Sequence, residues 1–207
     1  MAIVSTLILS GCSDPADSVH KTSADAAHDA PETAAAAKRY VIQPESAIGF
    51  VGSKVTGSHD GGFKEFEGTI NVVDGAVAPA TQVTIKMDST WSDNENLTGH
   101  LKSPDFFNVE EHPEATFTVT AVEPAETGSK VTGNLNLHGV TKSISFPATI
   151  TVTDEAVAVN AEFAINRKDF NINYPGKPND LIRDNVVIKL ALSATPGPAQ
   201  AQIESAN

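Results

Sequence analysis

The chain has 207 residues, a net charge of −12 and a pI of about 4.8. This length allows one domain with a substantial core, while the acidic balance disfavours nucleic acid and anionic lipid headgroups as electrostatic partners. Hydrophobic residues make up 40% of the chain, which is typical of a globular protein, and the one cysteine excludes an intrachain disulfide.

A short apolar run, residues 2–11, ends at Cys12. Residues 9–12, LSGC, resemble the lipobox of bacterial lipoprotein signal peptides, although no Lys or Arg precedes the run. The resemblance implies cleavage before Cys12 and anchoring through acyl chains on that residue. We therefore expect a signal peptide over 1–11 and a protein held at the periplasmic face of the cell envelope. Because Ser13 rather than aspartate follows the cysteine, the outer membrane is favoured.

Residues 13–37 are rich in Ser, Asp, Thr, Pro and Ala and show no apolar periodicity. A segment without an apolar face has little to bury, so we expect 12–37 to be a flexible tether. His20 and His28 lie in it and are expected to be solvated. The domain is expected to span 38–194, and the Pro-, Ala- and Gln-rich residues 195–207 to form a loose tail.

Most of the domain alternates apolar and polar residues, as half-buried strands do. Residues 144–152 show the cleanest alternation, and Pro147 within it marks an edge, a bulge or a free amide position. The expected strands are 40–42, 47–55, 66–72, 83–87, 116–121, 131–137, 143–152, 157–165 and 186–192.

One segment, near residues 94–107, is typical of a helix rather than a strand. Leu97 and Leu101 are four residues apart and share a helical face. Asp93 is a candidate N-cap, and Ser103 followed by Pro104 indicates a second helix start. We expect a short helical insertion that covers an apolar surface.

Eight or nine antiparallel strands fit both a sandwich and a closed up-and-down barrel. Short connections and long strands favour the barrel, whose interior at eight strands either fills with side chains or holds one ligand. Several inward alternation positions are small, which favours a cavity; these positions are Gly68, Ala121, Gly133, Ala148 and Ala161.

Four sequence blocks, in order, resemble the YceI-like family: GHLKSPDFF at 99–107, HPEATF at 112–117, GNLNLHGVTK at 133–142 and NRKDFNI at 166–172. The resemblance covers about 39–193 and departs at Asn171, where family members often have glycine. It implies an all-β, antiparallel, eight-stranded extended lipocalin-like barrel whose apolar pocket holds a polyisoprenoid or another long-chain amphiphile. It implies no general catalytic activity.

Such a pocket needs apolar walls and a few polar groups at its mouth. The candidate pocket residues are Phe106, Phe107, Phe117, Leu135, Leu137, Phe146, Phe163, Ile165, Ile188 and Leu190, each of which also fits ordinary core packing. The candidate headgroup contacts are His100, Lys102, Arg167 and Arg183, each of which also fits an exposed loop charge or a structural hydrogen-bond partner.

We find no G-x-S-x-G, H-E-x-x-H, P-loop or dinucleotide-binding motif in the sequence, and no metal-ligand spacing. We therefore expect a binding protein that is not an enzyme, without metal or cofactor, carrying a polyisoprenoid or quinone-like lipid for storage, shielding or transport. Its partners would be the lipid and the membrane, with a homodimer left open. The alternative is a filled barrel that acts as a surface scaffold or stress-response partner.

Overall fold

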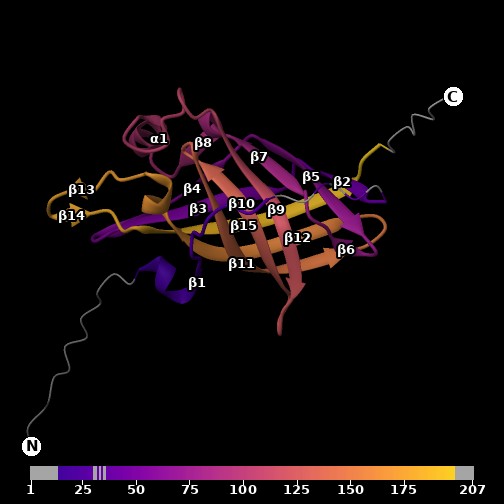
Figure 1. Ribbon diagram of the computed structural model, residues 1–207. Coiled ribbons are helices and arrows are strands. Elements are labelled where there is room, and N and C mark those ends of the chain that lie inside the picture. Colours follow the sequence, from indigo (N-terminus) through magenta and orange to yellow (C-terminus); the bar gives the residue numbers. More distant parts are fainter. Residues whose placement is uncertain (1–13, 30–31, 33, 35, 199–207) are drawn as a thin grey trace, which may run out of the picture.

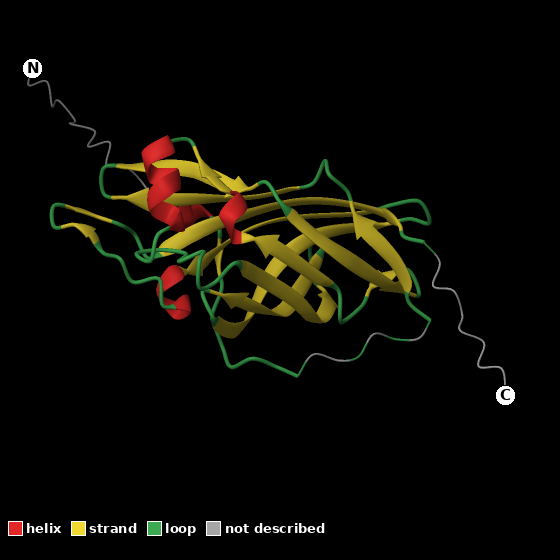
Figure 2. Cartoon of the chain, turned by 90° about the horizontal axis from the view of Figure 1, so that it is seen from above, coloured by secondary structure: helices red, strands yellow, loops and turns green. Residues whose placement is uncertain are grey.

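The computed structural model describes residues 14–29, 32, 34 and 36–198. The expected signal peptide, Cys12 and most of the expected tail therefore lie outside the described residues. The described chain forms an elongated, eight-stranded antiparallel β-barrel with one short α-helix at one end (Figures 1 and 2). The predicted fold class is confirmed.

The strands of the wall are β2 (Lys38–Ile42), β3 (Ala47–Lys54), β4 (Gly57–Phe63), β5 (Phe66–Val73), β7 (Gln82–Lys86), β8 (Thr90–Ser92), β9 (Glu114–Pro124), β10 (Ser129–Leu137), β11 (Val140–Val152), β12 (Val157–Asn166) and β15 (Asn185–Pro196). The shorter elements are η1 (Pro15–Ser18), β1 (His20–Lys21), β6 (Ala76–Val77), η2 (Met87–Ser89), α1 (Glu95–Lys102), η3 (Arg167–Phe170), β13 (Gly176–Lys177) and β14 (Asp180–Leu181).

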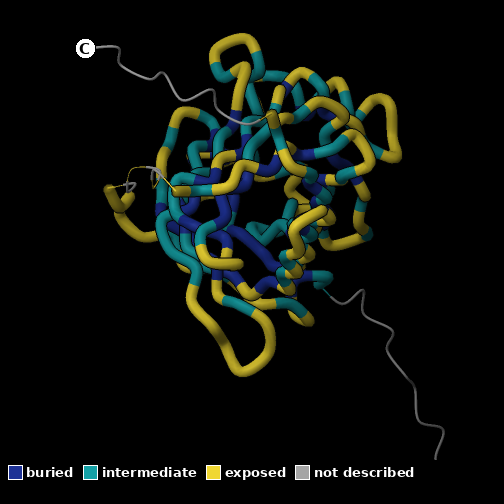
Figure 3. Tube along the Cα trace, turned by 90° about the vertical axis from the view of Figure 1, so that its right-hand side faces the viewer, coloured by how far each residue is buried: buried dark blue, intermediate teal, exposed yellow. Residues whose placement is uncertain are grey.

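The barrel closes because β12 pairs with both β11 and β15, while the wall continues from β11 through β10, β9, β7, β5 and β2 back to β15. Three of its strands are interrupted: β3 continues β2, β4 leads into β5, and β8 continues β7. These continuations lengthen the wall toward α1. Seen end-on, the chain forms a ring that contains the buried segments, with exposed loops around it (Figure 3).

Alternation explains which residues fill the barrel. On β11, Ile144, Phe146 and Ala148 are buried, and Phe146 stacks on Phe163 of β12 with ring centroids 4.0 Å apart. Pro147 lies in the part of β11 that precedes the ladder with β12, which begins at Thr149. A proline is tolerated there because that edge of the strand needs no amide from it.

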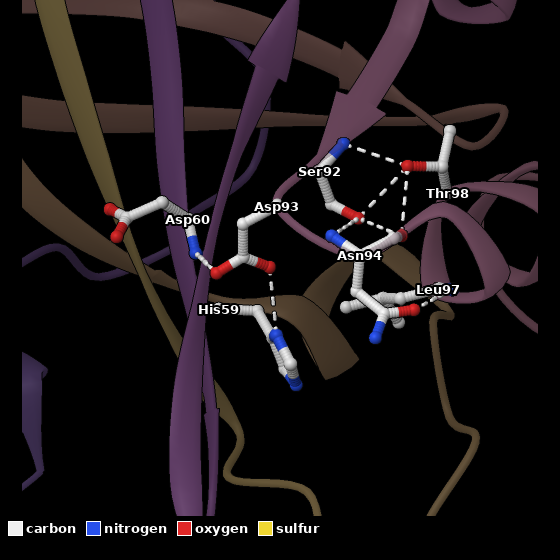
Figure 4. A network of polar contacts seen from close by, with 7 residues as sticks. All are labelled: His59, Asp60, Ser92, Asp93, Asn94, Leu97 and Thr98. Atoms are coloured by element: carbon white, nitrogen blue, oxygen red, sulfur yellow. Dashed lines mark hydrogen bonds and ion pairs between the residues drawn. The ribbon is translucent and has the colours of Figure 1, made fainter.

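The helix α1 begins one residue later than the sequence indicated. Asn94, rather than Asp93, is the N-cap, and its side chain accepts a hydrogen bond from the Leu97 amide at 3.0 Å. Asp93 instead accepts from His59 Nδ1 at 2.8 Å and from the Asp60 amide at 3.2 Å, so its carboxylate holds α1 to β4 (Figure 4).

The second helix start expected at Ser103 is wrong. Ser103 ends α1, because its amide and its hydroxyl both donate to the His100 carbonyl, at 3.1 and 2.8 Å. The residues that follow form turns, in which the Phe106 amide donates to the Ser103 carbonyl at 3.0 Å. The helical insertion is therefore shorter than 94–107.

Residues 14–28 differ from the expected flexible tether, because they pack on the outside of the barrel. Ala16 of η1 is fully buried in an apolar cluster with Val51, Ala164 and Val187. β1 pairs in parallel with β12, and Asp25 exchanges two backbone hydrogen bonds with Ser143 of β11.

The physical reason is that β11 and β12 do not pair with each other along their whole length. β11 and β12 pair with each other only over Thr149–Val152 and Val157–Asn160, so farther along the two strands their facing edges are free. Residues 20–25 bond into those edges.

At the other terminus, β15 runs to Pro196 and the Gly197 amide donates to the Arg39 carbonyl, so the first residues of the expected loose tail belong to the barrel.

The interior contains two apolar clusters. One extends from α1 along β9 to β12, and the other surrounds Tyr40, Ile70 and Val157 toward the opposite end. Within the described part of the chain, no helix combines the length and apolarity needed to cross a membrane.

Candidate ligand-binding site

All ten predicted pocket residues belong to the apolar cluster beside α1 or pack against it. Five of them are buried: Phe106, Leu137, Phe146, Phe163 and Ile165. Five are partly buried: Phe107, Phe117, Leu135, Ile188 and Leu190. The structure thus brings the predicted set together, and their contact with a ligand remains a prediction.

The partly buried residues of this set show how completely the barrel interior is packed. Phe117, Leu135, Ile188 and Leu190 lie on barrel strands and pack against the interior clusters, yet each keeps part of its surface exposed. In a fully packed interior such side chains would be buried. Their partial exposure shows that neighbouring side chains do not cover them completely.

Small inward residues do not by themselves create this space. A Cβ at Gly133 would collide with the ring of Phe117, and one at Gly68 would collide with Ile42. The expectation that these glycines leave room is wrong at both positions, since larger neighbours lie over them.

A cavity of about 620 Å³ opens in the wall between β2–β3 and β4–β5. Its apolar lining includes Ile42, Ile48, Phe63 and Phe66. A second cavity, of about 490 Å³, lies at the end of the barrel opposite α1. There the buried side chain of Tyr40 donates a hydrogen bond to the Thr153 carbonyl at 2.8 Å.

The α1 end carries two aromatic groups. Phe107 contacts Phe50 and Phe63, with ring centroids 6.4 and 6.0 Å apart. Phe106 contacts His100 and Tyr174, at 5.0 and 5.3 Å. The predicted cover thus exists, but Phe106 is itself buried core.

Sequence reasoning missed Phe63 and Tyr174 as members of these groups. Phe63 lies between the expected strands 47–55 and 66–72, and Tyr174 lies in a long connection without periodicity. The aromatic side chains themselves were the only available signal.

The four headgroup candidates have different surroundings. His100 Nε2 lies 2.8 Å from Asp105, and Lys102 lies 3.1 Å from Asp88. Arg183 forms an ion pair with Asp14 at 3.5 Å. These three side chains are part-exposed, and their contact with a headgroup remains a prediction.

Arg167 is different, because its side chain is buried and hydrogen-bonded within the protein. Its guanidinium donates to the carbonyls of Ile172, Arg183 and Ile182 at 2.6, 3.1 and 3.4 Å. Burial lowers the pKa of this side chain, and the nearby charge of Asp184 opposes that shift. We therefore assign Arg167 to the structure of the 166–185 connection rather than to a headgroup.

Two histidines meet near η3. The rings of His112 and His138 lie 4.6 Å apart, and His138 Nδ1 lies 3.2 Å from the Phe170 carbonyl. Burial and the nearby His112 lower the pKa of His138. His100 contacts Phe106 and Tyr174 instead. No group of three His, Cys, Asp or Glu side chains suited to a metal ion occurs among the described residues.

Comparisons with known proteins agree with this architecture. The YceI-like domain matches residues 40–194. A UPF0312 protein of Pseudomonas putida strain W619 is 37% identical over 159 residues, covering 69% of this chain and 80% of that protein.

Among solved structures, BcnA of Burkholderia cenocepacia aligns with a TM-score of 0.66 and 25% identity, covering 73% of this chain and 97% of that one. A polyisoprenoid binding domain from Saccharophagus degradans, implicated in plant cell wall breakdown, aligns with a TM-score of 0.63 and 18% identity over 78% and 99% of the two chains. The chain therefore belongs to the YceI-like family.

Proposed function

We propose that this protein binds a long-chain polyisoprenoid, or a similar amphiphilic lipid such as a quinone, in the apolar interior of the barrel. The observation that carries the proposal is the partial exposure of inward-packing apolar residues such as Leu135, Ile188 and Leu190. The fold shared with a polyisoprenoid binding domain supports it.

The energetics fit a hydrocarbon ligand. Burial of apolar groups is worth roughly 0.8 kcal/mol per methylene, so about ten buried carbons give about 8 kcal/mol before association costs are subtracted. Before those costs are subtracted, that gross energy corresponds to a Kd of about 1 μM. Retention of this kind requires apolar walls and no catalytic group.

The cellular role follows from the N-terminal sequence. If Cys12 is acylated, as the lipobox-like LSGC sequence indicates, the barrel is held at the periplasmic face of the envelope. We propose that it stores, shields or carries the lipid there, as a binding protein rather than an enzyme.

Mass spectrometry of an organic extract tests the proposal. The unlipidated chain, residues 13–207, is purified from a bacterial host, so that the packed segment 14–28 is kept and Cys12 is omitted. A stoichiometric isoprenoid or quinone is the expected result. An empty protein that also takes up no added polyprenyl lipid would contradict the proposal and favour the filled-barrel scaffold.

A point variant locates the site. Phe107→Ser should weaken lipid retention with little effect on folding, because Phe107 is only partly buried between Phe50 and Phe63. The matched control is Val41→Ser, whose side chain is exposed on β2 and should leave retention unchanged. Equal retention in Phe107→Ser and the native chain would place the lipid elsewhere.

A further inference from the structure

The barrel wall contains a break in its hydrogen bonding. The β3–β4 ladder ends at the pair Ile48–Phe63, and the β2–β5 ladder begins at the pair Val41–Thr69. Between these pairs, the described residues 42–47 and 64–68 form no backbone pairing with each other.

Each side of the break is bonded to its other neighbour. The Gln43 amide donates to Ser193 of β15 at 2.8 Å. On the opposite side, the Lys64 amide donates to Ser89 at 3.2 Å, and the Lys86 amide donates to Glu65 at 2.9 Å. Backbone hydrogen bonds thus hold both sides of the break, so the break is an ordered feature of the wall rather than a frayed strand end.

The cavity of about 620 Å³ lies at this break, and residues from both sides of the break line it. Ile42, Ile48 and Phe66, which belong to or pack against the interior clusters, line it together with rim residues such as Lys64 and Glu65. An apolar chain that enters this cavity therefore contacts side chains of an interior cluster.

The residues on the outer side of the break suit contact with a bilayer surface. Trp91 is 37% exposed, and its Nε1 lies 3.0 Å from where a Cβ of Gly62 would be. Tryptophan prefers the interface between hydrocarbon and water. The charged rim consists of two lysines and two glutamates, Lys64, Lys86, Glu65 and Glu67. These charges balance and do not repel a zwitterionic membrane.

Aromatic side chains lie at both ends of the barrel. Phe106, Phe107 and Tyr174 lie at the α1 end, and the buried Tyr40 lies at the other. We propose that the break between β2–β3 and β4–β5 is a lateral port through which the chain of the bound lipid exchanges between the barrel interior and a bilayer. This inference rests on the proposed function and adds the route of transfer.

The test obstructs the port with a bulky side chain at its rim. Ala47 is exposed and lines the cavity, so Ala47→Trp should obstruct it. Ala191 on β15 is the cross-strand partner of Ala47, is also exposed, and does not line the cavity, so Ala191→Trp is the matched control. Glu67→Trp obstructs the port from the opposite side and serves if Ala47→Trp does not fold.

The measured quantity is the rate at which a fluorescently labelled geranylgeraniol moves from phosphatidylcholine vesicles into the protein. We expect at least tenfold slower transfer for Ala47→Trp and Glu67→Trp, native rates for Ala191→Trp, and equal final occupancy in all. Native rates in both port variants would overturn the port while leaving lipid binding intact. A native chain that takes up no isoprenoid at all would overturn the proposed function and the port with it.

Discussion

Replacing Arg167 with Met tests whether this buried guanidinium acts in structure or in ligand binding. The change removes the donors to Ile172 and Arg183, at 2.6 and 3.1 Å, and the longer contact to Ile182. Each hydrogen bond from a charged donor contributes about 1.5–3 kcal/mol, so the two short ones amount to about 3–6 kcal/mol. Methionine relieves the burial of a charge, which offsets about 1–2 kcal/mol.

We therefore expect Arg167→Met to lower the free energy of unfolding by about 3 kcal/mol. Urea denaturation, followed by the fluorescence of the single tryptophan, measures this change. Arg167→Lys should recover part of the loss, because one ammonium cannot reach all the carbonyls. Lys102→Met, at a partly exposed ion pair, is the control and should change stability by less than about 1 kcal/mol. A change below about 0.5 kcal/mol in Arg167→Met, accompanied by lost lipid retention, would refute the structural assignment and restore the headgroup role.

Three further predictions concern local features of the fold. Asn94→Ala should cost about 1 kcal/mol in urea denaturation, because the N-cap of α1 is lost, whereas Asp93→Ala should leave helix capping unaffected. The pKa of His138 is lowered in the folded protein, so the folded state binds this proton more weakly than the unfolded state does. Protonation therefore costs stability as the pH falls below the ordinary histidine pKa, and this cost is absent above that pKa. The native chain should thus lose more stability than His138→Gln between about pH 7.5 and 5.5, and parallel losses would contradict the burial effect. Ala16→Asp should detach residues 14–28, seen as faster hydrogen exchange at Thr22 and Asp25 with the barrel amides still protected.

The sequence predicted the barrel because its strands show a local signal. In residues 144–152 every second side chain is apolar, and this pattern fixes both the strand and its inward face. Eight of the ten candidate pocket residues come from the same alternation, and Phe106 and Phe107 come from the expected helical insertion. The N-terminal segment was missed because it bonds through its backbone to free strand edges, and such pairing leaves no periodic pattern in the sequence.

The N-cap of α1 and the lateral port were not predicted, because both depend on contacts between residues that are distant in the sequence. Asp93 has the right chemistry for an N-cap, but its carboxylate is bound by His59 and Asp60 of β4. Pro44 marks an interruption between β2 and β3 in the sequence. Only the register shows that this interruption faces another at residues 64–65, where the two together open the wall.

If Cys12 is acylated, as we propose, the packed segment 14–28 also sets how far the barrel can move from that anchor. A flexible linker of about 25 residues would give a mean reach of about 28 Å. Asp14, however, is ion-paired with Arg183, so the packed segment begins two positions after Cys12, and two residue steps of extended chain span at most about 7 Å. An acylated molecule would then search by two-dimensional diffusion along one leaflet, and delivery to a partner across the periplasm would require that partner to come to it.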